Sequence, residues 1–197
     1  MALPASLVLA TRNPHKLREF GRLLAPASIT VQALPDGIEL PPEVGETFEA
    51  NAIPKALTAA AATGRAALAD DSGIEAAALD GRPGVRSARY GGPGADDEDN
   101  LRKLMLEAPA GSALRYVCAL AYVDPASGVE RVFLGDCRGR LAAGVRGSGG
   151  FGYDPAFLPD DEPDGRTMAQ LSDEEKDRIS HRGRAVRALL AWDETGS

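Results

Sequence analysis

The chain has 197 residues, of which 44% are hydrophobic and 26% are charged, and its formal net charge is −7. This length suits one sizeable domain with a core, and the acidic balance argues against nucleic-acid binding, which needs a basic surface. Cys118 and Cys137 lie outside any CxxC pair, which argues against a disulfide scaffold or a zinc site and predicts buried, reduced strand residues. We also find no signal-peptide pattern and no long apolar run, so we expect a cytoplasmic protein without a membrane partner.

The first half of the chain predicts strands alternating with helices. Residues 6–10 form an apolar strand, and Asn13 as N-cap with Pro14 at the first helical position then predicts a helix that ends near Pro26. A second strand follows over residues 29–33, and then a Pro-rich acidic loop over residues 36–45. Thr47 caps a long helix that ends at Thr63, with Gly64 as its terminator. A short strand over residues 66–69 runs into the acidic turn Asp70-Asp71-Ser72-Gly73.

The second half predicts a helix over residues 97–107 and then a hairpin of two long strands, residues 113–123 and 129–141. A further strand is expected over residues 151–158. Thr167 with Gln170, and Ser172 with Glu175, have capping-box spacing and start helices, the last of which ends near Trp192. This order predicts an α/β fold with a central mixed β-sheet flanked by helices.

Thr11-x-Asn13-x-x-Lys16 spans the end of the first strand and the start of the first helix. A helix N-terminus presents unpaired N–H groups and a positive dipole end, which attract phosphate. Lys16 lies in the first turn, where the dipole disfavours a cation unless an anion is bound there. The simpler interpretation is a capped helix with an exposed lysine.

Acidic residues provide the candidate metal ligands. A Mg²⁺ ion that bridges substrate phosphates needs only one or two protein carboxylates, and Glu43, Glu46, Asp70 and Asp71 lie on the Pro-rich loop and at the strand end. Because neighbouring strand residues point to opposite faces, Asp70 and Asp71 should have different roles. The alternative is an ordinary turn built from turn-forming residues.

Residues 147–152 match the GxGxxG dinucleotide fingerprint. We reject this match because the fingerprint must be followed by a helix, whereas residues 153–157 are typical of a strand. The glycines can instead let the backbone approach a ligand, with Phe151 or Tyr153 stacking on a base, or they form a flexible connection beside core aromatics.

Lys176, Ser180, His181 and Arg182 form the last group of polar residues. Ser180 can cap a new helix that begins at His181, and His181 with Arg182 can donate hydrogen bonds to the 6-keto group of a purine. A solvated, charged helix end explains the same residues without a ligand. The chain has no P-loop, nucleophile-elbow, HExxH or kinase motif.

The order of these motifs is more specific than any one of them. From about Leu7 to Leu190 the chain resembles the inosine triphosphate pyrophosphatase family, whose bacterial members are dITP/XTP pyrophosphatases. The resemblance rests on the following motifs: Thr11-x-Asn13-x-x-Lys16, Phe48-x-x-Asn51-Ala52-x-x-Lys55-Ala56, Ala69-Asp70-Asp71-Ser72-Gly73, Gly84-Val85-x-Ser87-Ala88-Arg89-Tyr90, Gly149-Gly150-Phe151-Gly152-Tyr153-Asp154-Pro155 and Glu175-Lys176-x-x-Ile179-Ser180-His181-Arg182.

The resemblance implies a single domain over residues 1–197, with two lobes around a substrate cleft, that forms a homodimer. It implies Mg²⁺-dependent hydrolysis of noncanonical purine nucleoside triphosphates (ITP, dITP, XTP) to the monophosphate and pyrophosphate, which cleanses the nucleotide pool. Two other functions stay open: a Maf-like nucleotide pyrophosphatase with another base preference, and a nucleotide-binding regulator without catalysis.

By motif match, Asp71 is the catalytic proton acceptor, and Glu43 with Asp71 holds the metal, with Glu46 as a rival to Glu43. Asp70 is left with a supporting role. Arg12 replaces a small residue of many relatives and can either contact phosphate or narrow the entrance. The substrate-binding positions implied are Thr11, Arg12, Asn13, Pro14, His15, Lys16, Lys55, Ser72, Phe151, Gly152, Tyr153, Asp154, Lys176, His181 and Arg182.

Overall fold

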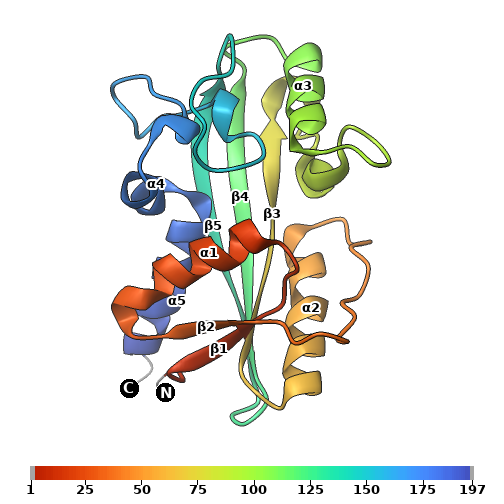
Figure 1. Cartoon of the computed structure of the whole chain (residues 1–197), viewed down its shortest axis with the longest axis vertical. Coiled ribbons are helices and arrows are strands. Elements are labelled where there is room, and N and C mark those ends of the chain that lie inside the picture. The colour runs from red at the N-terminus through yellow and green to blue at the C-terminus, as the bar shows by residue number, and fades with distance from the viewer. Residues whose placement is uncertain (1–2, 196–197) are drawn as a thin grey trace. The chain divides into compact units, whose positions relative to one another are not determined.

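The computed structural model describes residues 3–195, whose helices and strands are shown in Figure 1. Six strands form one sheet in the order β2-β1-β3-β4-β5-β6. The strands are β1 (Ser6–Leu9), β2 (Thr30–Ala33), β3 (Ala67–Ala76), β4 (Ala113–Asp124), β5 (Val129–Leu141) and β6 (Phe157–Pro159). The sheet is mixed, as predicted, because β1 pairs parallel with β2 and β3 whereas β5 pairs antiparallel with β6.

Five α-helices and five 3₁₀ helices lie within the described part of the chain. The α-helices are α1 (Pro14–Leu24), α2 (Phe48–Thr63), α3 (Asp97–Glu107), α4 (Asp173–Ile179) and α5 (His181–Thr195). The 3₁₀ helices are η1 (Ala25–Ala27), η2 (Ala77–Leu79), η3 (Gly84–Arg89), η4 (Asp154–Ala156) and η5 (Met168–Gln170). Of the α-helices and 3₁₀ helices between residues 3 and 195, none is long and apolar enough to cross a membrane.

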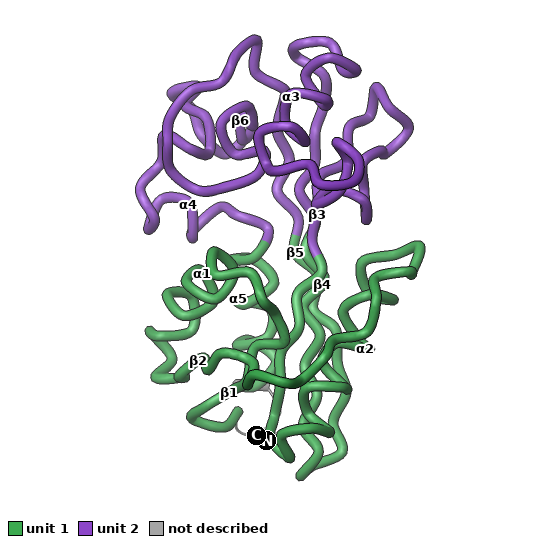
Figure 2. Tube along the Cα trace, turned by 45° about the vertical axis from the view of Figure 1, so that its right-hand side comes forward, with its two compact units in different colours: residues 1–71, 118–135, 182–197 green, residues 72–117, 136–181 purple. Residues whose placement is uncertain are grey.

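The chain divides into two compact units, coloured separately in Figure 2. Unit 1 contains the described residues of Met1–Asp71, Cys118–Gly135 and Arg182–Ser197, and unit 2 contains Ser72–Val117 and Asp136–His181. Strands β3, β4 and β5 each continue from one unit into the other. The expected single domain over residues 1–197 extends at both ends beyond the described residues. Met1 and Ala2, which belong to the segment searched for a signal peptide, also lie outside the described residues.

Helices cover both faces of the sheet in unit 1: Figures 1 and 2 show α1 and α5 on one side and α2 on the other. Leu7 and Leu9 of β1 pack in one cluster with Phe20 of α1 and Leu189 of α5. Val8 points to the opposite face, because side chains alternate along a strand. That face meets α2, whose small buried residues Ala52, Ala56, Ala59 and Ala60 let the helix lie close to β1.

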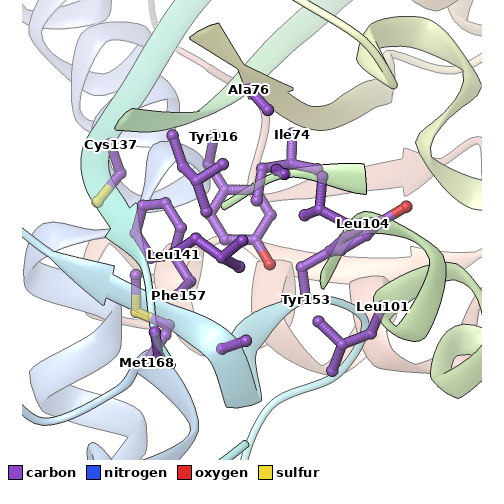
Figure 3. Packing of buried hydrophobic residues seen from close by; sticks show 14 of the residues in the cluster. Ile74, Ala76, Leu101, Leu104, Tyr116, Cys137, Leu141, Tyr153, Phe157 and Met168 are labelled. Carbon is purple, nitrogen blue, oxygen red and sulfur yellow. The ribbon is translucent and has the colours of Figure 1, made fainter. Parts of the chain in front are cut away.

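The core of unit 2 is built around aromatic side chains, as Figure 3 shows. Tyr116 of β4 packs against Phe157 of β6 with ring centroids 4.6 Å apart. Leu104 of α3 and Ile74 of β3 are both fully buried in the same cluster. Tyr153 and Ala156 of this core lie on either side of Asp154 in the chain and so help to fix its backbone.

Two predicted segments differ from the structure. Residues 70–73 do not form a turn: β3 continues through them to Ala76. The predicted strand over residues 151–158 is confined to β6, because Gly152 has φ of 64° and the 3₁₀ helix η4, with Pro155 in it, precedes β6. Thr167 likewise starts only the short 3₁₀ helix η5.

Other local predictions are confirmed. Asn13, Thr47 and Ser172 cap α1, α2 and α4 with their side chains, and a new helix begins at His181 directly after Ser180. Cys118 and Cys137 are buried, unbridged residues of β4 and β5.

Candidate active site

Side chains of the loop after β1 accept hydrogen bonds from backbone N–H groups of the loop and of the first turn of α1. The Asn13 side chain accepts hydrogen bonds from the backbone N–H groups of His15 (2.8 Å) and Lys16 (3.3 Å). The Thr11 hydroxyl accepts from the backbone N–H of Asn13 at 3.1 Å. Pro14 has no N–H, so the first donors of α1 are met within the chain.

Lys16 is not the exposed lysine of a simple capped helix. Its Nζ lies 2.6 Å from Oδ2 of Asp70, whose side chain is fully buried. Oδ2 of Asp70 also lies 3.4 Å from Nε of Arg182, and Oδ1 accepts a hydrogen bond from the Cys118 thiol at 3.1 Å. Burial alone would raise the pKa of Asp70, but the charges of Lys16 and Arg182 outweigh burial and hold that pKa well below its ordinary value.

Arg182 bonds to a second buried acid on the other side of its guanidinium. NH1 donates to Oε2 of Glu19 at 2.9 Å, and Glu19 lies one turn after Lys16 on α1. Burial opposes the charge of Arg182, yet Asp70 and Glu19 raise its pKa, so the arginine stays ionised. Arg182 therefore balances the charge of Asp70 from within unit 1.

Asp71, the next residue of β3, has different partners. Its Oδ2 accepts a hydrogen bond from the Asn51 side chain at 2.9 Å, and its Oδ1 lies 3.7 Å from Nζ of Lys55. The same Nζ bonds to Oε1 of Glu43 at 2.7 Å and to the backbone oxygen of Asp70 at 2.9 Å. Lys55 thus joins the two predicted metal-binding carboxylates, and Glu46 remains an exposed residue of the same loop.

The environment of Asp71 favours a proton acceptor more than a fixed anion. Burial is the largest influence and raises the pKa of Asp71, with a further contribution from Glu43. Lys55 and Asn51 act in the opposite direction without cancelling that increase. A carboxylate with a raised pKa accepts a proton more readily than an ordinary aspartate.

Glu43 and Asp71 offer oxygen atoms only, which suits a hard cation such as Mg²⁺. Between residues 3 and 195 there is no cluster of three or more acidic, histidine or cysteine residues that could enclose an ion by itself. The fit is therefore to an ion held by one or two carboxylates that takes its other ligands from phosphate and water.

Asp154 is the centre of the polar group in unit 2. Its Oδ2 accepts hydrogen bonds from Nζ of Lys176 at 2.7 Å and from the backbone N–H of Phe151 at 3.0 Å. Its Oδ1 accepts from the Tyr116 hydroxyl at 3.0 Å. The ammonium of Lys176 lies 5.2 Å from the centre of the Phe151 ring, a cation–π arrangement.

His181 is buried and stacks on Tyr116, with ring centroids 4.6 Å apart and planes at 5°. Tyr153 donates its hydroxyl to the backbone oxygen of Ser87 at 2.8 Å, and burial raises the pKa of that hydroxyl. The backbone N–H of Gly152 donates to Oδ2 of Asp97 at 3.0 Å. Phe151 to Asp154 and His181 are thus fixed by neighbours within unit 2.

The remaining predicted residues lie as follows. Arg12 bonds to the backbone oxygens of Leu34, Pro35 and Ile38 at 2.7, 2.8 and 2.9 Å. His15 Nδ1 lies 2.8 Å from the guanidinium of Arg18. Ser72 is a half-buried residue of β3 in unit 2.

Several residues that contact the predicted site residues had no predicted role, among them Asn51, Tyr116, Glu19 and Cys118. Asn51 precedes Lys55 by four residues, which puts both on one face of a helix, so a signal was present. Glu19 was visible as a charge beside the apolar positions of α1. Tyr116 and Cys118 lie in an apolar strand and could not be told from core residues.

The fold and these two groups define an α/β protein with lysine–carboxylate pairs at β3 in unit 1 and a buried pair between α4 and η4 in unit 2. The sequence model of the Ham1 family matches residues 7–192. A protein of Symbiobacterium thermophilum named dITP/XTP pyrophosphatase is 52% identical over 93% of this chain and 92% of its own length. One of the same name from Mycolicibacterium paratuberculosis is 49% identical over 96% of each chain.

A solved structure of a HAM1 protein from Coxiella burnetii is also similar, with a TM-score of 0.83, 36% identity and full coverage of both chains. The chain belongs to the Ham1 family. The family resemblance and the mixed α/β fold that were expected from the motifs are both confirmed.

Proposed function

We propose that this protein hydrolyses noncanonical purine nucleoside triphosphates, namely ITP, dITP and XTP, to the monophosphate and pyrophosphate. The observation that carries the proposal is the link from Glu43 through Lys55 to Asp71, beside the Lys16–Asp70 pair. Two lysines and three carboxylates with these contacts suit a triphosphate that arrives with a divalent cation. The names of the relatives point to the same activity.

In this mechanism, a water molecule attacks the α-phosphorus and Asp71 accepts its proton. The bond from the α-phosphorus to the bridging oxygen breaks, and pyrophosphate leaves. Lys16 and Lys55 bind phosphate oxygens and offset the charge that develops there. Glu43 and Asp71 would hold Mg²⁺, which supplies further charge neutralisation on the phosphates when bound.

Base recognition is assigned to Phe151 and His181 of unit 2 and to Arg182. Phe151 would stack on the purine, and the buried His181 would donate to a 6-keto oxygen. Adenine presents an amino donor at that position, and two donors facing each other are unfavourable. Arg182, a residue of unit 1, would be the second donor to the 6-keto oxygen. Asp154 keeps Lys176 and the Phe151 backbone in place.

The other residues of the motif match would also bind substrate. Thr11, Arg12, Asn13, Pro14 and His15 would line the phosphate site with Ser72, while Gly152 and Tyr153 would adjoin the base. Residues 1–197 would act as one domain in a cytoplasmic homodimer. Glu43 is favoured over Glu46 as a metal ligand because Glu43 contacts Lys55.

A panel of triphosphates tests the proposal. Purified protein with Mg²⁺ is incubated with ITP, XTP, dITP, GTP, ATP, dTTP and UTP, and pyrophosphate and monophosphate are quantified separately. We expect pyrophosphate from the first three and little turnover of ATP or GTP. Preference for a triphosphate other than these three would indicate a Maf-like enzyme. Binding without turnover would indicate a regulator, and release of single phosphates would indicate another reaction.

A further inference from the structure

The buried side chain of Asn51 forms hydrogen bonds to Gly45 and to Asp71. Its Oδ1 accepts from the backbone N–H of Gly45 at 2.7 Å, and its Nδ2 lies 3.5 Å from the Gly45 oxygen. The same Nδ2 donates to Oδ2 of Asp71 at 2.9 Å. Only 3% of Asn51 is exposed, so this amide links the Pro-rich loop directly to the carboxylate of Asp71.

The loop lies tightly against the start of α2 at this point. A Cβ atom on Gly45 would come within 2.8 Å of both Oδ1 of Asn51 and Cβ of Ala50. Glu43 precedes Gly45 by two residues, and its carboxylate reaches Lys55, one turn after Asn51 on α2. One face of α2 therefore contacts both Glu43 and Asp71, through Lys55 and Asn51.

We propose that Asn51 is a positioning residue that orients the Asp71 carboxylate and sets the distance from Asp71 to Glu43. This inference rests on the proposed function, because it assigns to these carboxylates the reaction described above. An amide suits the task because it donates to Asp71 and accepts from Gly45 at once. Hydrogen-bond partners of metal-binding carboxylates commonly change metal affinity or activity by about 10–100-fold when removed.

Asn100 of α3 provides a matched control. It is a buried asparagine of unit 2 whose Oδ1 accepts from the backbone N–H of Gly91 at 2.6 Å and whose Nδ2 donates to the Ala88 oxygen at 3.3 Å. It fastens a glycine-containing loop as Asn51 does, but its bonds go to backbone atoms. A purely structural role for Asn51 predicts the same behaviour for Asn51→Ala and Asn100→Ala.

The experiment compares wild type, Asn51→Ala and Asn100→Ala in two measurements. The first is kcat and KM for ITP at saturating Mg²⁺. The second is Mn²⁺ binding with the α,β-methylene analogue of ITP, which cannot be cleaved at that bond, followed by the loss of the free-ion EPR signal. We expect Asn51→Ala to lower kcat by at least about tenfold and to weaken Mn²⁺ binding by about tenfold, with Asn100→Ala near wild type in both.

Equal effects of Asn51→Ala and Asn100→Ala on both measurements would overturn the inference. If Asn51→Ala does not fold, Asn51→Asp decides, because its carboxylate still accepts from Gly45 but no longer donates to Asp71. A kcat of Asn51→Asp equal to wild type would also overturn the inference. Failure of wild type to release pyrophosphate from ITP would instead reject the proposed function, and the Mn²⁺ comparison would still test the placement of the carboxylates.

Discussion

Asp70 and Asp71 are neighbours in β3 and have opposite electrostatic environments. Lys16 and Arg182 hold the pKa of Asp70 low against the effect of burial, whereas burial raises the pKa of Asp71. Strand alternation alone predicted different roles for them, and their partners do differ. The identity of those partners could not be predicted, because Arg182 is 112 residues away from Asp70 along the chain.

Asp71→Asn should lower kcat for ITP by about 10²–10⁴-fold, because the amide cannot accept the proton of the attacking water. Binding of the α,β-methylene analogue, measured by calorimetry, should change far less. Glu46→Gln is the control, since this exposed glutamate lies on the same loop as Glu43. Turnover of Asp71→Asn close to wild type would remove Asp71 from the mechanism.

Asp70→Asn should destabilise the protein by about 3–5 kcal/mol at pH 7, because it leaves Lys16 and Arg182 partly uncompensated in a buried site. The pKa of Asp70 is lower in the folded chain than its ordinary value of 3.8. Its stabilising effect is therefore complete well above that ordinary pKa and is lost as the pH falls below it. Urea unfolding from pH 7 to pH 3 should show the gap between variant and wild type starting to narrow at the acid end, as Asp70 of the unfolded chain becomes protonated.

Asp71 has the opposite effect on the pH dependence of stability. Because its pKa is raised in the folded chain, its contribution to the free energy of unfolding falls as the pH rises through that folded-state pKa. Comparing Asp70→Asn with wild type at each pH removes this common background. A gap that stays constant down to pH 3 would show that folding does not lower the pKa of Asp70.

At the scale of elements, the Pro-rich loop is fastened at two places. Arg12 bonds to the backbone oxygens of Leu34 and Pro35, which lead into the loop, and of Ile38 within it. Asn51 holds the loop at Gly45. Glu43 lies between these two attachments. The loop that bears a candidate metal ligand is thus held by side chains from α2 and from the segment after β1.

Arg12→Ala should loosen this loop and leave the rest of unit 1 unchanged. Each lost hydrogen bond contributes about 0.5–1.5 kcal/mol, so amide exchange over residues 34–45 should become faster, as measured by mass spectrometry. Arg18→Ala is the control, since Arg18 is exposed on α1 and contacts His15. Unchanged exchange with a higher KM for every triphosphate would instead indicate the phosphate contact considered from the sequence.

Helices and their caps were well predicted because the signals are local. Asn13, Thr47 and Ser172 act where the spacing placed them. The prediction of a turn at residues 70–73 was wrong because its polar residues satisfy tertiary contacts: Asp70 meets Lys16 and Asp71 meets Asn51 while the backbone stays extended. Local turn propensity cannot register partners so distant in the chain.

At the scale of the whole molecule, each unit has its own hydrophobic cluster, and β3, β4 and β5 belong to both units. Continuous strands cannot lose their order in one unit without disturbing the backbone hydrogen bonds that lead into the other. Family membership was predicted from motifs spread along the chain, because their order is specific to the family even where each motif alone is ambiguous. The order of strands in the sheet could not be predicted, because strand pairing is not local.

Leu104→Ala, in the core of unit 2, should lower the free energy of unfolding by about 2–5 kcal/mol. The denaturant midpoint should fall equally for probes in unit 1 and for probes in unit 2. Leu106→Ala on the same helix is the control, because Leu106 is 81% exposed and Leu104 is fully buried. Hydrogen exchange at the two ends of β4 measures the stability of each unit separately, because residues up to Val117 belong to unit 2 and residues from Cys118 belong to unit 1. Two midpoints, with only the unit 2 end of β4 affected, would contradict this coupling.

The buried pairing of Arg182 with Asp70 also sets an order of events during synthesis. Arg182 is added 112 residues after Asp70. At about 5–20 residues per second this separation lasts on the order of ten seconds. During that time Asp70 can pair with Lys16 but not with Arg182. Unit 1 can therefore complete the burial of this carboxylate only after the ribosome has synthesised all of unit 2, which ends at His181.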